Sequence, residues 1–435
     1  MEERSMMNIT DAARAILARN DRGGYTVPTD GLYPFQWNWD SAFVSMGFAT
    51  FDIDRAYQEL ERFTEGQWDD GMFPHIVFHV PSDSYFPGPD VWQTEHRHPK
   101  KPTTSGITQP PVFGMALRFI YERALAENRT DVVERTCVLF EAALRSHRWW
   151  LKARDPDKCG LVAILHPWES GSDNSPAWDE ALTRVSTITK TEIRRQDTKH
   201  VNATMRPRNI DYQRFIHLVE VYRECEWDPI KQWSHAPFKI ADVQITAILA
   251  RATLDLLWIA SHLNLSDAIK ELSTMHQLLI NGLKSRWNEN IRGFVSFDLI
   301  SGKNIEKLTQ SCFIPLIAVE LNSHQRKIIQ DEIERWCQGM VVGVPSTAPF
   351  STDFESKRYW RGPVWAVINW LIADGLRKNQ LVELATITEG NTINVIERAG
   401  FCEYFDPITG EGLGGNTFSW TAATYLVLRR RLADS

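Results

Sequence analysis

Apolar residues recur at three- and four-residue spacing along most of this 435-residue sequence. The pattern is clearest over residues 110–128 and 131–155, where it predicts two amphipathic helices. The same spacing predicts further helices over residues 209–225, 239–263, 266–287, 323–338, 362–375, 378–398 and 417–433. Strand-like alternation is rare and short, and residues 293–297 are the best candidate for part of a hairpin. We therefore expect an all-α fold.

Two of these helices carry capping signals at their starts. Asp131 precedes Glu134 by three positions, a pattern typical of a capping box. Ser266 stands at the start of another helical pattern and is a candidate N-cap for the helix over residues 266–287.

The predicted helices follow one another in pairs, joined alternately by short turns and by long polar loops. Successive antiparallel pairs form either an open solenoid or a closed toroid. The sequence has no repeat of fixed period, which argues against a solenoid. No linker rich in Gly, Pro or Ser divides the chain. We therefore expect a single domain over residues 1–435, an (α/α) toroid or barrel whose active-site face is formed by long loops, inserted at about 70–110 and 154–208.

The charge balance excludes several classes of partner. The chain has 48 Lys and Arg residues against 55 Asp and Glu residues, a net charge of −7 and a pI near 6.0. A mildly acidic surface has no general attraction for nucleic acid or for anionic membranes. The longest apolar stretch, residues 245–260, is interrupted by Arg251 and Asp255, so we expect no membrane span.

The six cysteines are far apart and form no CxxC pair and no zinc-ligand cluster. We expect buried free thiols in a reducing compartment, and no metal or other cofactor. The N-terminal residues lack the apolar core of a signal peptide, so we expect a cytoplasmic protein.

The 17 tryptophans point to a class of ligand. Many of them lie in polar segments rich in Gly and Pro instead of on apolar helical faces. The flat apolar face of an indole suits the C–H face of a pyranose ring, so the count motivates a sugar-binding hypothesis. Because long loops are uncommon without a function, we expect the chemistry in residues 24–42, 70–110, 154–208, 346–365 and 399–420.

Two of these loops carry acids beside indoles. Asp40 follows Trp37 and Trp39, and its carboxylate is suited to accept hydrogen bonds from adjacent sugar hydroxyls. Alternatively, Asp40 caps the helix that follows it. Asp173 lies in a tight turn flanked by indoles and is a candidate general acid if burial keeps it protonated. Alternatively, Asp173 forms an Asx-turn with nearby backbone N–H groups.

The later loops offer a base, a pocket wall and a cation. Glu403, in an aromatic setting, and Glu411, in a Gly-rich turn, are candidate general bases, although a C-terminal connector has the same composition. Residues 358–365 either wall a pocket or pack in the core through Tyr359, Trp360 and Trp365. Arg206 and Arg208 precede a helix and are suited to clamp a carboxylate, although surface positions are commoner for any single arginine.

Five such segments in the same order resemble bacterial members of glycoside hydrolase family 63, with looser similarity to trehalases of family 37. They include WESGSDNS (168–175), RYWRGPVW (358–365) and CEYFDP (402–407). The resemblance extends from residue 20 to residue 423, and the glucosylglycerate and mannosylglycerate hydrolases are close to the match. It implies an (α/α)6 toroid and hydrolysis with inversion of anomeric configuration. The sequence contains no GxSxG, Walker or HExxH motif of competing enzyme classes.

Matched residue by residue, the resemblance implies Asp173 as the general acid and Glu403 as the general base, with Glu411 as the fallback. It implies that the glycone is bound by Trp37, Trp39, Asp40, Gln109, Trp168, Gly171, Trp360 and Trp365. It places around the aglycone Tyr85, Arg206, Tyr212 and Tyr359. We add two further substrate-binding residues, Tyr33 and His75. An inverting mechanism separates its two carboxyl groups by roughly 6.5–9.5 Å, which leaves room for a water molecule.

Arg206 favours a substrate that carries a carboxylate, and we expect a 2-O-α-glycosylglycerate, glucosyl ahead of mannosyl. One alternative is an α-glucosidase of the same fold that acts on neutral disaccharides or oligosaccharides. A sugar epimerase would use histidine bases such as His75 or His79, and a non-catalytic sugar-binding toroid would have no need of Asp173. Members of the family often assemble as dimers or tetramers, so the resemblance leaves a homo-oligomer open.

Overall fold

The structure, a computed structural model, describes residues 8–99, 102–199 and 201–434. About half of the chain, 53%, is helical. The long helices are α1 (Ile9–Asn20), α2 (Asn38–Phe48), α3 (Ile53–Thr64), α5 (Phe113–Ala126), α6 (Val133–Arg154), α8 (Asn209–Glu224), α10 (Val243–His262), α11 (Ser266–Lys284), α12 (Ser323–Cys337), α13 (Ala366–Lys378), α14 (Val382–Ala399) and α15 (Ser419–Asp434).

Short elements lie in the connections between these helices. The short helices are α4 (Pro89–Trp92), α7 (Asp179–Leu182) and α9 (Pro229–His235). The strands are β1 (Gln36–Trp37), β2 (Ile76–Phe78), β3 (Thr103–Thr104), β4 (Ala163–Ile164), β5 (Ile240–Ala241), β6 (Trp287–Asn288), β7 (Gly293–Phe294), β8 (Phe297–Asp298), β9 (Lys303–Asn304), β10 (Tyr404–Phe405) and β11 (Gly412–Leu413). They pair antiparallel in the orders β1-β2-β3, β4-β5-β8-β9, β6-β7 and β10-β11. The fold is therefore mostly helical, as expected, with small sheets in the connections between the helices.

Each helix predicted from periodicity is present, with ends that differ by a few residues. The predicted hairpin fragment is also present in part. Gly293 and Phe294 form β7, which pairs with β6, whereas Phe297 begins β8 in a different sheet.

The two predicted capping signals are wrong. Ser266 is the first residue of α11, and its N-cap is Leu265, which makes no side-chain cap hydrogen bond. Asp131 lies in a 3-10 turn before α6, and its carboxylate forms an ion pair with Arg129 at 2.7 Å. Helix α11 begins at Ser266 itself and α6 begins two residues after Asp131, so neither side chain occupies the N-cap position of its helix.

Three long helices lie outside the set predicted from periodicity, α1, α2 and α3, although α2 entered as the helix that Asp40 was considered to cap. The signal for α3 was present, because its buried residues follow helical spacing and include Ile53, Tyr57, Leu60 and Phe63. Its start is also marked, since the Asp52 carboxylate accepts a hydrogen bond from the Arg55 backbone N–H at 2.9 Å.

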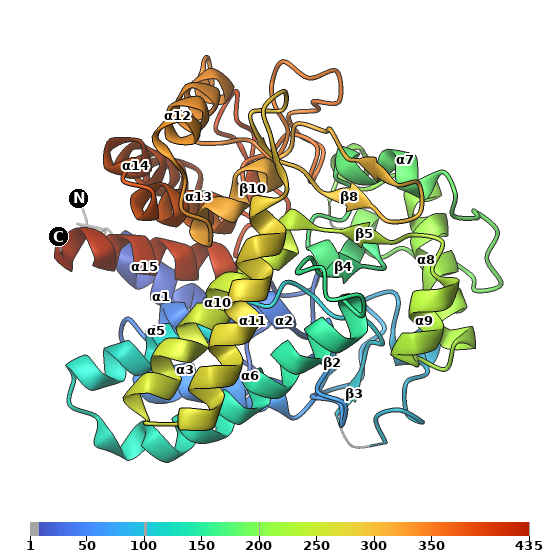
Figure 1. The fold of residues 1–435 in the computed structure, drawn as a ribbon, viewed down its shortest axis with the longest axis horizontal. Coiled ribbons are helices and arrows are strands. Elements are labelled where there is room, and N and C mark those ends of the chain that lie inside the picture. The colour runs from blue at the N-terminus through green and yellow to red at the C-terminus, as the bar shows by residue number, and fades with distance from the viewer. Residues whose placement is uncertain (1–7, 100–101, 200, 435) are drawn as a thin grey trace, which may run out of the picture.

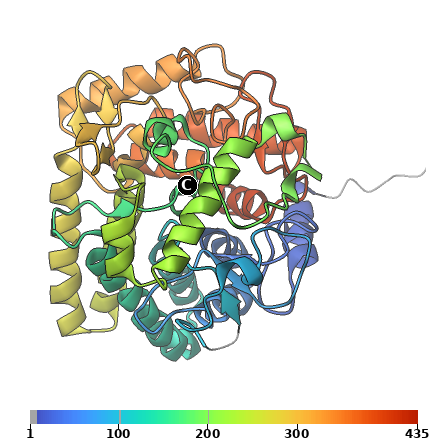
Figure 2. The ribbon, with the colours of Figure 1, turned by 90° about the vertical axis from the view of Figure 1, so that its right-hand side faces the viewer.

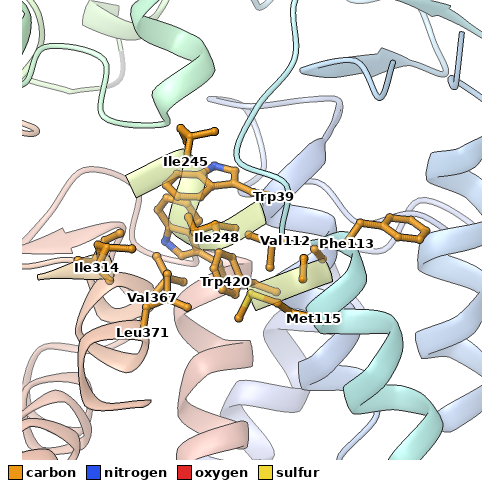
Figure 3. Close-up of a cluster of buried hydrophobic side chains, with 14 of the residues drawn as sticks. Trp39, Val112, Phe113, Met115, Ile245, Ile248, Ile314, Val367, Leu371 and Trp420 are labelled. Carbon is orange, nitrogen blue, oxygen red and sulfur yellow. The ribbon is translucent and has the colours of Figure 1, made fainter. Parts of the chain in front are cut away.

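Side chains from several helices meet in one apolar core. α2 packs against α3, α5 and α15, while α10 packs against α5 and α11. Figure 3 shows the convergence of residues from α2, α5, α10, α13 and α15, including Trp39, Ile248, Leu371 and Trp420. Trp39 in this core also reaches the cavity described below, so the core directly supports the candidate site.

α10 is the helix that contains the long apolar stretch. Its length and its mean hydropathy of 1.5 would suffice for a membrane span. However, 78% of its apolar segment is buried inside the protein. Its two charged residues are paired, because Arg251 donates to Asp255 at 2.9 Å. Such burial is what the central helix of a packed core shows.

The cysteines differ in part from expectation. All six are free, and three of them are buried, but Cys159 is exposed. The N-terminal segment considered for a signal peptide begins outside the described residues.

The strands β2, β3 and β5 and the helices α7, α8 and α9 gather on one side of the molecule, as Figure 1 shows, and Figure 2 looks onto that side. Helices α1 and α15 lie toward the opposite side, where α15 packs against α1 and α2. The connections around β2, β3 and α7 therefore lie on the side away from these two helices.

Candidate active site

A single cavity brings together segments that lie far apart in the sequence. Its lining residues are Pro28, Tyr33, Trp37, Trp39, Asp40, His75, Tyr85, Phe86, Gln109, Trp168, Gly171, Asp173, Asp197, Arg206, Tyr212, Tyr359, Trp360, Glu403, Phe418 and Trp420. Every residue predicted for the site except Trp365 is among them. Glu411, the fallback base, lies outside the cavity and pairs with Lys357 at 2.5 Å.

Asp173 lies in a turn that is braced by buried hydrogen bonds. The indole N–H of Trp178 donates to the Ser172 carbonyl at 2.8 Å, and Gln310 donates to the Ser172 hydroxyl at 3.1 Å. Gly171 adopts φ +70°, and a Cβ there would lie 2.6 Å from the Trp39 ring. This position therefore needs glycine both for its backbone conformation and for the close approach of the indole.

Asp173 is partly open to the cavity but surrounded by protein. Burial raises the pKa of its carboxyl to about 7, an effect that Arg206 opposes and that Glu403 and Asp197 reinforce. A carboxyl group with a pKa near neutrality keeps a proton that it is able to donate. The role of Asp173 as a general acid stays a prediction, which its position in the cavity lining supports.

Glu403 is 1% exposed and stands directly before β10. Its Oε1 accepts hydrogen bonds from the Tyr33 hydroxyl at 3.1 Å and from Arg206 Nη1 at 3.4 Å, and its Oε2 accepts one from the Gly415 N–H at 3.2 Å. Burial raises the pKa of Glu403, while these three donors act to lower it. A Cβ at Gly414 would come within 2.3 Å of Oε2, so the carboxylate lies directly against backbone.

Asp40 lies in the first turn of α2 and is 6% exposed. It does not cap the helix, because the N-cap position is occupied by Trp37. Burial raises the pKa of Asp40 well above its usual value, and the neighbouring carboxyl groups of Glu403 and Asp173 add to the rise. Three carboxyl groups are thus close enough to influence one another's protonation.

Arg206 is a buried cation of the cavity, 3% exposed. Its Nε donates to Asp197 at 3.2 Å and its Nη2 donates to the Tyr33 hydroxyl at 2.6 Å. Burial by itself would lower the pKa of Arg206, but Tyr33, Tyr359, Glu403 and Asp197 raise it well above the usual value. The guanidinium therefore stays charged, whereas the neighbouring Arg208 is an exposed residue with a surface partner, Glu355, at 3.3 Å.

Asp197 is a cavity residue absent from the predicted site. It receives hydrogen bonds from Arg195 at 3.1 and 2.7 Å, and Arg195 in turn stacks over the Tyr212 ring at 4.0 Å. Burial acts to raise the pKa of Asp197, but the hydrogen bond from Arg195 and the charges of both arginines lower it overall. Pro28, Phe86, Phe418 and Trp420 were missed as well, although all four lie within the span of the family resemblance, residues 20–423.

Aromatic rings form much of the cavity wall. The His75 ring stacks near the Trp168 ring, with centroids 6.0 Å apart, and the Trp39 and Trp360 rings are 6.1 Å apart. Within the described part of the chain, His75 Nδ1 and Trp360 Nε1 have no hydrogen-bond partner. Burial and the nearby His166 lower the pKa of His75 well below its usual value, so the ring is neutral.

Trp365 is the predicted site residue that the structure places elsewhere. It is 1% exposed and stacks face to face on Trp360, with centroids 3.8 Å apart and planes 2° apart. Its indole N–H donates to the Tyr359 carbonyl at 3.2 Å. Trp365 therefore supports the wall from behind and does not form part of it.

Among residues 8–99, 102–199 and 201–434, no group of three His, Cys, Asp or Glu side chains is arranged to hold a metal ion. The cavity instead combines an acid with a pKa near neutrality, a second buried carboxyl group and aromatic walls. That combination, on a helical fold, defines the protein as a glycoside hydrolase.

Comparison with known proteins gives the family. Residues 33–421 match the family described as "Mannosylglycerate hydrolase MGH1-like glycoside hydrolase domain". The chain belongs to this family, which is part of glycoside hydrolase family 63.

Relatives match the chain over nearly its whole length. A mannosylglycerate hydrolase of Thermus thermophilus is 44% identical, covering 95% of this chain and 99% of that protein. A glucosylglycerate hydrolase of Mycolicibacterium hassiacum is 34% identical, covering 95% of this chain and 96% of that protein. The crystal structure of a family 63 mannosylglycerate hydrolase from Thermus thermophilus in complex with Tris superposes with a TM-score of 0.91 at 42% identity, covering 97% of this chain and 100% of that one.

Proposed function

We propose that this protein hydrolyses 2-O-α-glycosylglycerates with inversion of configuration, using Asp173 as the general acid and Glu403 as the general base. The observation that carries the proposal is a charged guanidinium, Arg206, buried in a cavity that also holds these two carboxyl groups. A neutral disaccharide gives such a cation no partner, whereas the carboxylate of a glycerate aglycone does.

Asp173 supplies the proton for the leaving group. Its pKa of about 7 keeps a large fraction of the carboxyl protonated near neutral pH. As the C1–O bond of the substrate breaks, the Asp173 proton passes to the glycosidic oxygen and glycerate leaves with its hydroxyl restored.

Glu403 activates the water. Its carboxylate accepts one proton as the water oxygen bonds to C1 from the face opposite the leaving group, and the hexose is released. Tyr33, Arg206 and Gly415 donate hydrogen bonds to Glu403, which favours the ionised form that a base requires. For this mechanism we expect the two carboxyl groups to stand roughly 6.5–9.5 Å apart when substrate is bound.

The rings and polar groups of the cavity bind the hexose. Trp39, Trp168 and Trp360 offer apolar faces to the pyranose, and the unpartnered His75 Nδ1 and Trp360 Nε1 are available to its hydroxyls. The relatives with the higher identities bear the name mannosylglycerate hydrolase, at 44% and 40%. We therefore place mannosyl ahead of glucosyl, which reverses the preference from sequence alone.

The proposal extends to the architecture. The contacts among α2, α5, α10, α13 and α15, together with that of α15 with α1, support a closed (α/α)6 toroid formed by a single domain. The loops at about 70–110 and 154–208 form its active-site face, since Tyr85 and Asp173 lie within them. We further propose a cytoplasmic enzyme that acts on a small-molecule glycoside.

The test is release of free hexose from mannosylglycerate, glucosylglycerate, trehalose and kojibiose by the wild type and by Asp173→Ala. We expect turnover of a glycosylglycerate, its loss in the variant, and a first product of inverted configuration in the NMR spectrum. Turnover of the neutral disaccharides alone would overturn the glycerate assignment, and a product of retained configuration would overturn the assignment of Glu403 as a base.

A further inference from the structure

Arg206 contacts the general base as well as the space proposed for the aglycone. One guanidinium nitrogen, Nη1, lies 3.4 Å from Glu403 Oε1. The other, Nη2, donates to the Tyr33 hydroxyl at 2.6 Å, and that hydroxyl donates to the same Glu403 oxygen at 3.1 Å. Arg206 therefore acts on Glu403 directly and through Tyr33.

A cation in this position weakens the base. A positive charge beside a carboxylate stabilises its ionised form and lowers its proton affinity. The charge of Arg206 is the strongest of the influences that lower the pKa of Glu403. Because both residues are at most 3% exposed, solvent screens their interaction little.

The other groups that face Glu403 do not supply a second positive charge. They come from the segment before β1, α2, the acid turn, the loop before α13 and the residues beside Glu403 itself. They are Asp40, Asp173, Tyr33, Tyr359, Cys402 and Tyr404. All of them are neutral or negative, so Arg206 is the cation among these groups whose pairing acts on Glu403, and the coupled carboxyl groups of Asp40 and Asp173 respond with it.

We propose that Arg206 is shared between the carboxylate of the aglycone and Glu403, so that an anionic aglycone strengthens the general base when it binds. A substrate carboxylate against the guanidinium offsets the charge that Glu403 experiences in the empty site. The aglycone then contributes to the rate of water activation and not only to binding. This inference rests on the proposed function. It explains why substrates with an anionic aglycone should have a higher kcat than substrates with a neutral one.

Asp197 holds Arg206 in the position that this sharing requires. Its carboxylate holds Arg206 Nε at 3.2 Å and is itself held by Arg195, so the guanidinium keeps its place while its outer nitrogens exchange partners. In this role Asp197 is a positioning residue, because it acts through Arg206.

The test compares a 2-O-glycosylglycerate with its carboxamide analogue on the wild-type enzyme, with kcat and KM measured across pH. The amide is the more electron-withdrawing group, so intrinsic leaving-group ability alone would raise kcat. We expect instead that the amide lowers kcat by roughly three- to tenfold, in addition to raising KM, because it leaves Glu403 a weaker base. We also expect the acid limb of kcat to lie at lower pH with the amide.

The sign of that shift follows from the charges. With a bound carboxylate the pKa of Glu403 is higher, so activity is lost at a higher pH on acidification. With the neutral amide Arg206 keeps its full effect, and the loss occurs at lower pH. An amide that raises KM but leaves kcat and the acid limb unchanged would overturn the inference.

Variants separate this role from simple anchoring. Arg206→Gln should place the acid limb at nearly the same pH for both substrates, because the cation through which the substrate carboxylate acts on Glu403 is gone. Arg208→Gln is the matched control, since Arg208 is exposed and pairs with Glu355, and it should keep the wild-type difference. A difference that persists in Arg206→Gln would refute the inference, whereas absence of hexose release by the wild type from either glycosylglycerate would refute the proposed function itself.

Discussion

At the scale of single residues, the cavity joins four carboxyl groups to one guanidinium that contacts two of them. Asp197 is held by Arg195 and Arg206, and these neighbours lower its pKa despite its burial. Burial raises the pKa of Asp40 and Asp173, and the surrounding carboxyl groups raise both further. At neutral pH the cluster thus holds protons that isolated carboxyl groups release, which is the condition that a general acid needs.

The pH profile of hydrolysis should show the titration of Asp173. Since the acid must be protonated to donate, activity is present below the pKa of Asp173 and is lost as the pH rises through about 7. We expect this basic limb in kcat/KM, which reports the free enzyme. Because Asp40 and Glu403 interact with Asp173, the midpoint belongs to the cluster as a whole.

A substrate whose leaving group needs no proton supplies the control. Hydrolysis of α-mannosyl fluoride should lack the basic limb while keeping the acid limb of the base. If the fluoride and the glycosylglycerate lost activity at the same pH on the basic side, the role of Asp173 as general acid would be contradicted.

Most site residues were predictable because they stand in dense local patterns, such as the indoles beside Asp40 and the glycine beside Asp173. Asp197 has no such pattern. It lies in a polar segment, and its importance comes from Arg206 and Arg195 folding around it. Trp365 shows the opposite error, since its motif matched a wall, but stacking on Trp360 puts it in the second layer.

At the scale of elements, one buried ion pair joins the end of α6 to the turn that carries the acid. Arg154, the last residue of α6, donates to Glu169 at 2.8 Å, and the two side chains are 1% and 0% exposed. Glu169 also accepts the Leu165 N–H at 2.7 Å. The pair therefore fixes where the acid turn begins relative to the helix before it.

Removing one partner of the Arg154–Glu169 ion pair should destabilise the fold. We expect Arg154→Met to lower the free energy of unfolding by roughly 3–5 kcal/mol, because it leaves Glu169 charged, buried and unpaired. Urea unfolding measures the loss, and the remaining folded enzyme should show a reduced kcat. The exposed pair of Lys190 and Glu224 is the control, and Lys190→Met should leave stability and kcat unchanged.

The double variant Arg154→Met, Glu169→Met decides between two explanations. It should recover much of the stability, since no buried charge remains, but not kcat, since the turn has lost its anchor. Full recovery of kcat as well would show that the pair contributes stability alone.

Elements were predictable where they are long. The periodicity that predicts α5 and α6 extends over several turns, and each helix appears with small end shifts. The strands were not, because β4 and β5 have two residues each and acquire their pairing only from Ala163 meeting Ala241 across the fold. A two-residue strand carries no alternation to detect.

At the scale of the whole molecule, the last helix meets the first two, and that contact was not visible in sequence. Gly47 on α2 lies so close to α15 that an added Cβ would stand 2.5 Å from the Ala423 Cβ and 2.7 Å from its Cα. Small residues on both helices therefore set their separation. If the chain forms one toroid, this contact helps to close it.

Gly47→Ala tests whether that closure stabilises the molecule as one unit. The Ala423 backbone and its short side chain cannot move away easily from an added methyl group. We therefore expect overpacking to lower the free energy of unfolding by about 1–3 kcal/mol. Gly390→Ala on α14 is the matched control, because nothing lies within 4 Å of its added Cβ, and helix propensity should raise stability by about 0.5–1 kcal/mol. Urea unfolding followed by tryptophan fluorescence should show a single transition in both variants, shifted in opposite directions at unchanged slope. Two separate transitions in Gly47→Ala, only one of them shifted, would mean that parts of the chain unfold independently, and would refute the single-domain toroid.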